Sequence, residues 1–212
     1  MVQVKIAYLE NERHSGRKTS NSLAINTLGY LRIGVNSKFE KLNELGAGEF
    51  EHLNGSLIKH LHNTYKLLEK WGASQELCDS GLYHAAYGTA GFDEQVVSLS
   101  QRNDIANIIG DAAEEIVYLY CSCDRNFVFQ DFNANERIKF RDRFKDEEFI
   151  LTHEQAQQFC ELTVANEIEL AIDSNEFLAE HGKGLYYLFI KMKPLLSETA
   201  NKTVVSVLSS VA

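Results

Sequence analysis

Proline is nearly absent from this sequence, with Pro194 as its single example. Proteins built from many turns use proline often, so its scarcity favours long helices over a β-sandwich. No apolar run approaches the roughly 18 residues that span a membrane, and the opening residues MVQVKIAYLE lack the apolar core of a signal peptide. These absences predict a cytoplasmic protein with no membrane partner.

Basic residues are also scarce, since 21 Lys and Arg stand against 30 Asp and Glu and give a net charge of −9. Such a chain repels the backbone of nucleic acid, and we predict no nucleic-acid partner. Residues 1–45 are the exception, because basic side chains outnumber acidic ones there. A solvated basic arm is the more common outcome for such a segment, and attraction of an anionic ligand is the alternative.

Cysteine is limited to four residues. Cys121 and Cys123 are too close together for an ordinary zinc knuckle, and no second CxxC motif accompanies them. We therefore interpret the cysteines as small buried side chains with reduced thiols, with a metal or redox site as the alternative. A chain of 212 residues buries enough surface to fold without disulfide bonds.

Helical periodicity dominates what the sequence does contain. Apolar residues recur at helical spacing over 57–71, 77–85, 101–122 and 156–171, and 175–181 and 184–196 form one or two further helices. Capping signals support these helices: Ser74, Gly72, the break at Gly110 and the capping box of Thr152 with Gln155.

Three other segments complete the outline of the chain. Residues 2–8 alternate as a short strand or extended arm, and Glu136–Phe144 is predicted to be a short helix. The predicted fold class is all-α. We expect an arm with short helices at 1–45, a helical domain at 46–196 and a frayed tail at 197–212.

Two histidines lie on the inward faces of successive predicted helices, His60 on the first and His84 on the second. Neutral imidazole is the commonest protein ligand for zinc, iron and manganese. A single inward histidine is more often a satisfied core residue, but two on adjacent packed helices can meet at one metal ion.

Four segments resemble the HD superfamily, which is named for a metal-binding His-Asp doublet. They are HLHNTYKLLEKWG at 60–72, LCDSGLYHA at 77–85, DIANIIGDAAEEIV at 104–117 and LTVANE at 162–167. The hydrolase domain of the RelA/SpoT enzymes, which cleaves pyrophosphate from guanosine tetraphosphate, is similar over about residues 52–172. The resemblance implies an HD-like helical bundle.

A second family is more similar still, an HD-like family known only as a domain of unknown function. Its members show HL..TY..L..WG, GL.H..YGT..F, IG..AE..V.L…CDR and LT.AN. This chain carries all four patterns, at 60–72, 81–92, 109–125 and 162–167. The resemblance implies a fold and no established activity.

The departures from the HD pattern concern its metal ligands. Ala85 stands where the doublet has Asp, and Asn166 stands where the last metal-binding Asp belongs. Alanine offers no donor atom, and a neutral amide is a weak ligand for a divalent ion. Gly88 and Thr89 replace the acidic pair that serves the hydrolase reaction. A standard HD phosphohydrolase mechanism, which needs a metal and a carboxylate, is therefore undermined.

These observations define the expected site. His60, His84 and His52 are the predicted metal ligands, Asp124 and Tyr87 the catalytic candidates, and Tyr83, Thr89, Arg125 and Asn166 the ligand-binding candidates. A structural ion pair is the alternative role for Asp124.

We expect a degenerate HD-like, metal-dependent enzyme of hydrolase or oxygenase type that acts on a small polar or phosphorylated metabolite. The expected cofactor is a divalent ion such as Fe, Mn or Zn. The alternative is a catalytically inactive HD-like module that binds a ligand or regulates a partner.

Overall fold

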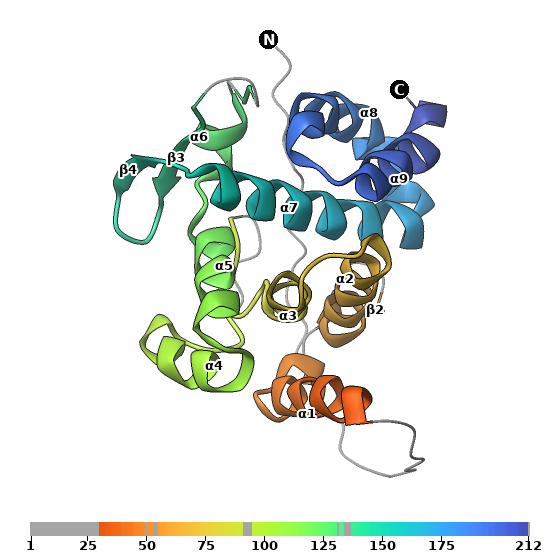
Figure 1. Ribbon diagram of the computed structural model, residues 1–212. Coiled ribbons are helices and arrows are strands. Elements are labelled where there is room, and N and C mark those ends of the chain that lie inside the picture. Colours follow the sequence, from red (N-terminus) through yellow and green to blue (C-terminus); the bar gives the residue numbers. More distant parts are fainter. Residues whose placement is uncertain are drawn as a thin grey trace.

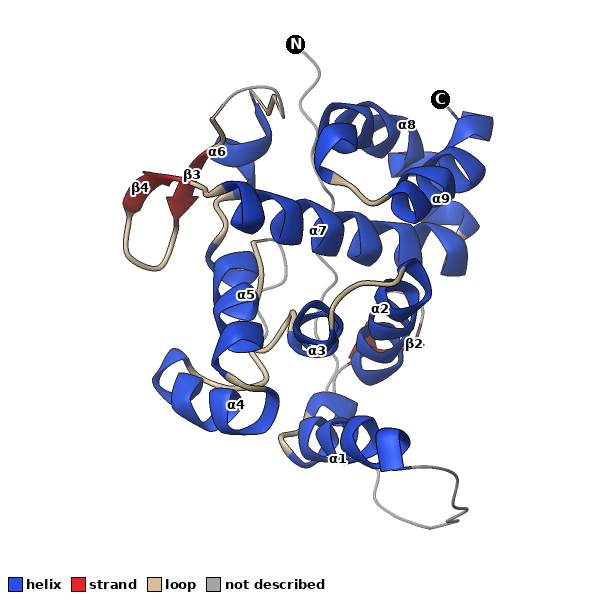
Figure 2. Cartoon of the chain, in the orientation of Figure 1, coloured by secondary structure: helices blue, strands red, loops and turns tan. Residues whose placement is uncertain are grey.

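The computed structural model describes residues 30–49, 51–52, 55–90, 95–130, 132–133 and 137–211. The helices of eight or more residues are α1 (Tyr30–Glu44), α2 (Leu57–Trp71), α3 (Gln75–Tyr83), α4 (Arg102–Ile109), α5 (Asp111–Ser122), α7 (His153–Asp173), α8 (Asn175–Met192) and α9 (Glu198–Leu208). A shorter helix, α6 (Arg125–Gln130), precedes the hairpin of β3 (Lys139–Asp142) and β4 (Glu147–Ile150), and β1 (Glu51–His52) pairs with β2 (Gly55–Ser56). The predicted all-α class is confirmed (Figure 2).

Helix α7 is the centre of the fold. It crosses the molecule with α8 and α9 on one side and α2, α3 and α5 on the other (Figure 1). Because neighbours cover it on several sides, every residue from Phe159 to Ala171 is buried, including Asn166, Glu167 and Glu169. Polar side chains buried inside a helical core need partners, and this requirement shapes the site described below.

The predicted helix ends agree with the structure where local chemistry specifies them. Gly72 follows α2 in the left-handed conformation at φ 80°, which is favourable for glycine. Ser74 accepts a hydrogen bond from the backbone of Leu77 at the start of α3, and Thr152 and Gln155 form the capping box of α7. The break at Gly110, with φ 90°, separates α4 from α5.

Two expectations differ from the structure, and a third is not tested by it. Residues 139–142 form β3 rather than a helix, because Phe140 pairs with Phe149 across the hairpin and packs edge-on against Phe159 of α7. The expected frayed tail instead forms α9, which Ser197 caps and which buries Ala200, Val204 and Leu208. The predicted extended arm at 2–8 lies outside the described residues.

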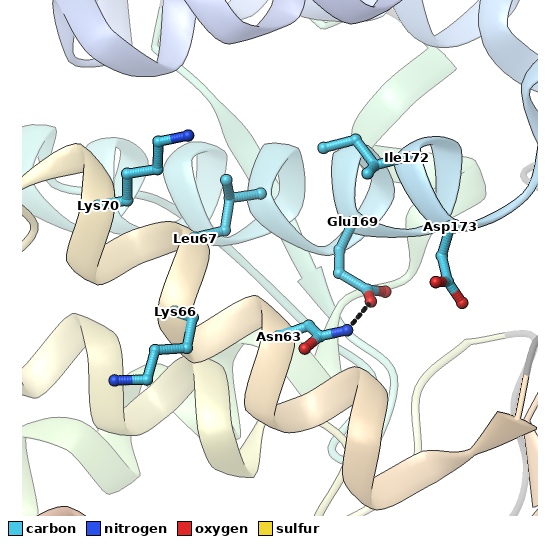
Figure 3. A pocket seen from close by; sticks show the side chains of 7 residues that line it. All are labelled: Asn63, Lys66, Leu67, Lys70, Glu169, Ile172 and Asp173. Carbon is cyan, nitrogen blue, oxygen red and sulfur yellow. Dashed lines mark hydrogen bonds between the residues drawn. The ribbon is translucent and has the colours of Figure 1, made fainter.

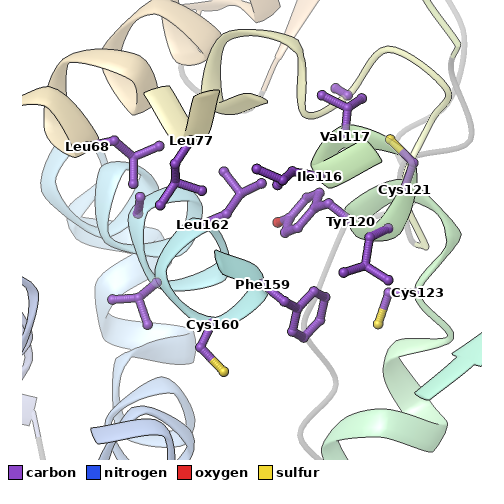
Figure 4. Close-up of a cluster of buried hydrophobic side chains, with 14 of the residues drawn as sticks. Leu68, Leu77, Ile116, Val117, Tyr120, Cys121, Cys123, Phe159, Cys160 and Leu162 are labelled. Atoms are coloured by element: carbon purple, nitrogen blue, oxygen red, sulfur yellow. The ribbon is translucent and has the colours of Figure 1, made fainter. Parts of the chain in front are cut away.

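The cysteines contribute to the apolar core. Cys121, Cys123 and Cys160 lie among the aromatic and aliphatic side chains between α5 and α7 (Figure 4), and Cys78 is buried in α3. Burial raises the pKa of the Cys78, Cys121 and Cys123 thiols to about 12. The four thiols are free and protonated, which supports the structural interpretation of these residues.

Among the described residues, no helix is both long enough and apolar enough to cross a membrane.

Candidate functional site

His60 and His84 meet in the interior of the helical bundle. His60 lies in the first turn of α2, and His84 is the residue that follows α3. Their Nε2 atoms are 3.2 Å apart, and their ring planes are inclined at 82°. Both side chains are buried. The two imidazoles, which the sequence predicts to share one site, are therefore in contact.

Close packing of α2 against α3 brings the histidines together. A Cβ at Gly81 would lie 2.5 Å from Cδ1 of Leu68, so a larger residue at this position would displace the Leu68 side chain. The carbonyl of Gly81 then accepts a 2.7 Å hydrogen bond from Nδ1 of His84. This bond fixes the ring of His84 and leaves its Nε2 as the atom that faces His60.

The other nitrogen of His60 is held from α7. Nδ1 of His60 contacts Oε2 of Glu169, while Oε1 of Glu169 accepts a hydrogen bond of 2.9 Å from Nδ2 of Asn63. Both histidines therefore use Nδ1 for an oxygen acceptor and present Nε2 to one another. Histidines that bind metals in proteins almost always show this division of roles between the two ring nitrogens.

Asn166 supplies a third polar atom at the same place. Its Oδ1 lies 2.9 Å from Nε2 of His60, and its Nδ2 donates a 3.0 Å hydrogen bond to Oε1 of Glu167. Glu167 is paired at 3.2 Å with Nη1 of Arg125, whose Nη2 donates to the Tyr120 hydroxyl at 2.8 Å. The structure thus brings Asn166 directly to the histidines and connects Arg125 to them through Glu167.

Other predicted residues point elsewhere. Tyr83 donates a 2.7 Å hydrogen bond to the carbonyl of Lys38 in α1, and Tyr87 donates one of 2.8 Å to Glu114 in α5. Burial raises the pKa of both phenols, so neither is suited to act as a base. Glu114 also accepts two 2.6 Å hydrogen bonds from the partly exposed Arg102, so it serves an ion pair rather than a capping box at the start of α5.

Asp124 has a structural contact of its own. Its Oδ1 accepts a 3.2 Å hydrogen bond from the backbone of Phe127, which caps the start of α6. This role explains a carboxylate directly after the end of α5, where the helix dipole is unfavourable to it. Among the described residues no hydrogen bond joins Asp124 to either histidine, so its catalytic assignment remains a prediction without a supporting contact.

Three further candidates have less to connect them with the histidines. Thr89 is buried, and its hydroxyl has no hydrogen-bond partner among the described residues. His52 lies in β1, but its side chain lies outside the described part of the chain. Ala85, the residue that follows His84, is buried, and its side chain offers no donor atom.

Sequence reasoning missed Glu167 and Glu169. Both follow Asn166 in a largely apolar stretch of α7, LTVANEIELAI at 162–172. Carboxylates inside a buried helix require partners. Two acidic residues in an apolar helical stretch were therefore the sequence feature that could have indicated their role.

A surface pocket reaches this network from outside. It has a volume of about 250 Å³ and lies between α2 and α7, lined by Asn63, Lys66, Leu67, Lys70, Glu169, Ile172 and Asp173 (Figure 3). Glu169 therefore faces the pocket and also touches His60, which places it between the surface and the histidines.

The donor atoms have a spacing that suits a metal ion. Two imidazole nitrogens bound to one tetrahedral ion at 2.0–2.1 Å lie about 3.3 Å apart, close to the observed 3.2 Å. Among the described residues no group of three or more His, Cys, Asp and Glu side chains is placed to hold a metal. The third donor would be the Asn166 amide oxygen, which is a neutral ligand.

The fold and the site define an all-α protein with a buried histidine pair held between three helical segments. A family model described as "Domain of unknown function (DUF6817)" matches residues 41–125. This match includes both histidines and Arg125 but ends before α7, which supplies Asn166 and Glu169. No curated protein matches the chain, and no solved structure matches it.

Proposed function

We propose that this chain is an HD-like protein that binds one divalent metal ion between His60 and His84 and acts as a metal-dependent enzyme on a small phosphorylated or otherwise polar metabolite. The observation that carries the proposal is the 3.2 Å separation of the two Nε2 atoms, with each Nδ1 engaged by an oxygen acceptor. The HD-like motifs in the sequence favour the same interpretation.

The donor set also indicates the kind of substrate. Nε2 of His60, Nε2 of His84 and Oδ1 of Asn166 are all neutral donors, whereas HD enzymes supply two aspartates. An ion held by neutral ligands keeps its full positive charge and supplies Lewis acidity toward a phosphate or a bound water. The Glu167 carboxylate, which is near this position, is already neutralised by Arg125. The site therefore favours an anionic substrate.

The chain's own residues orient the site. The Gly81 carbonyl holds the ring of His84 and the Glu169 carboxylate holds the ring of His60. Three protein donors leave other coordination positions open for water or substrate.

A second candidate function rests on a different observation. Asn166 contacts His60 and Glu167 at once, and Glu167 is paired with Arg125, so the polar groups partner one another without an ion. Such a network suits a metal-free module that binds a ligand or regulates a partner.

Metal analysis separates the two candidates. The protein is purified, stripped with chelator and titrated with Mn²⁺ and Zn²⁺, alongside His60→Ala, His84→Ala and the control His153→Ala, which changes an exposed histidine at the start of α7. The enzyme proposal predicts one ion per wild-type and control chain, none in the two site variants, and metal-dependent release of phosphate from a panel of phosphorylated metabolites. Absence of binding to the wild type contradicts it and leaves the metal-free module.

A further inference from the structure

The two oxygens of the Glu169 carboxylate are divided between two donors on α2. Oε2 contacts Nδ1 of His60, and Oε1 accepts the 2.9 Å hydrogen bond from Nδ2 of Asn63. His60 and Asn63 are three residues apart on a helix, so both side chains project from the same face toward α7. Glu169 therefore contacts two side chains of α2 that lie about one helical turn apart.

Because the Glu169 carboxylate is buried, it needs good hydrogen-bond partners. The Glu169 side chain is only 8% exposed, and removing a carboxylate from water without good partners is costly by several kcal/mol. Nearby lysines do not hold it: Lys59 is paired with Asp173 and Lys66 with Glu69. The partners of Glu169 are the imidazole of a site residue and the amide that keeps the carboxylate in place.

The contact determines how His60 presents its other nitrogen. An ionised carboxylate can only accept a hydrogen bond, so Nδ1 of His60 carries the proton that faces Glu169. Nε2 is then directed toward Nε2 of His84 and Oδ1 of Asn166. Carboxylates that hold the second nitrogen of a metal-binding histidine in this way typically change metal affinity by about 10–100-fold when they are removed.

We infer that Glu169 is a positioning residue for His60: it fixes the tautomer and the ring orientation that place Nε2 in the site, and it does so from the wall of the α2–α7 pocket. This inference rests on the proposed metal site for its effect on affinity. Its effect on the tautomer is a property of the metal-free protein.

The experiment compares Glu169→Gln and Glu169→Ala with the control Asp173→Asn, which lies one turn further along α7 in the same pocket and loses only the pair with Lys59. Isothermal titration with Mn²⁺ measures affinity. Long-range ¹H–¹⁵N correlation spectra of the metal-free proteins report which nitrogen of His60 carries the proton, and circular dichroism confirms that each variant is folded.

We expect a proton on Nδ1 of His60 in the wild type and in Asp173→Asn, and loss of that preference in Glu169→Ala. We expect Mn²⁺ affinity to fall about 10–100-fold in Glu169→Ala and by a smaller factor in Glu169→Gln, which keeps the shape and loses the charge. If Glu169→Ala does not fold, the Mn²⁺ affinity of Glu169→Gln decides.

The inference is overturned if a folded Glu169→Ala protein keeps the wild-type tautomer of His60, if Glu169→Gln binds Mn²⁺ as tightly as the wild type, or if Asp173→Asn weakens Mn²⁺ binding as much as the Glu169 variants do. A wild type that binds no Mn²⁺ or Zn²⁺ contradicts the proposed function instead, and the tautomer spectra then still decide the role of Glu169.

Discussion

Replacing Asn166 by aspartate returns a carboxylate to the position where HD enzymes have one. Asn166 is fully buried, with Oδ1 2.9 Å from Nε2 of His60 and Nδ2 donating at 3.0 Å to Glu167. The substitution removes this donor and places an oxygen against the Glu167 carboxylate. The charges of Glu167 and Glu169 already face Arg125 and His60, so the new carboxylate is an uncompensated charge in the metal-free protein.

The expected loss of stability can be estimated from these contacts. Loss of a hydrogen bond to a charged group and burial of an unpaired charge together destabilise a protein by about 3 kcal/mol. For a chain of this length, that corresponds to a decrease in Tm of about 6–12 °C. A divalent ion between the histidines supplies the missing positive charge, so the sign of the effect on metal affinity is opposite to the effect on stability.

Thermal melts of wild type and Asn166→Asp in EDTA and in Mn²⁺ test this reasoning. We expect a lower Tm for the variant in EDTA, a larger increase in Tm on adding Mn²⁺ than for the wild type, and tighter Mn²⁺ binding by titration. The matched control is Asn103→Asp on the exposed surface of α4, which should change neither quantity appreciably. The same Tm in EDTA and the same response to Mn²⁺ as wild type would refute the argument.

Three further predictions concern Asp124 and the buried cysteines. Asp124→Ala should lose the N-cap of α6 and lower the free energy of unfolding by about 1 kcal/mol, with Mn²⁺ affinity unchanged in titration; a tenfold loss of affinity would return Asp124 to the site. Burial raises the pKa of the Cys78, Cys121 and Cys123 thiols from 9.0 to about 12, so at pH 8 the folded protein holds about 1,000-fold less thiolate than the unfolded chain. The folded protein should therefore react with a disulfide reagent far more slowly than the denatured chain. Because these pKa values are higher in the folded state than in the unfolded state, their contribution to stability is complete below about pH 9 and is lost as the pH rises toward 12. Denaturant melts across this range should show that decline, and a midpoint that does not change between pH 8 and pH 11 would contradict it.

Local chemistry made much of the fold predictable. The ends of α2, α3 and α7 follow from Gly72, Ser74 and the Thr152–Gln155 box, because capping groups act within one turn and are visible in the sequence. The meeting of His60 and His84 was predictable for a similar reason, since both lie on apolar faces of successive helices joined by a short turn.

The remaining features depend on contacts between distant segments. Phe140 follows a helical pattern locally but is used in β3, because its partners Phe149 and Phe159 lie further along the chain. Asp124 could not be recognised as a cap while the start of α6 was unknown.

Glu169 was missed because its partners lie on α2, more than 100 residues earlier. Only the tertiary packing of α7 against α2 shows that one carboxylate holds both His60 and Asn63.

The most direct test of the central claim is a crystal structure of the wild-type protein grown with Mn²⁺ or Zn²⁺, with anomalous data collected at the absorption edge of the metal. The proposed function predicts one anomalous peak about 2.0–2.2 Å from Nε2 of His60 and from Nε2 of His84, with Oδ1 of Asn166 directed toward it. A structure at saturating metal concentration with no peak between the two histidines, and with Nε2 of His60 still in contact with Oδ1 of Asn166, would contradict it.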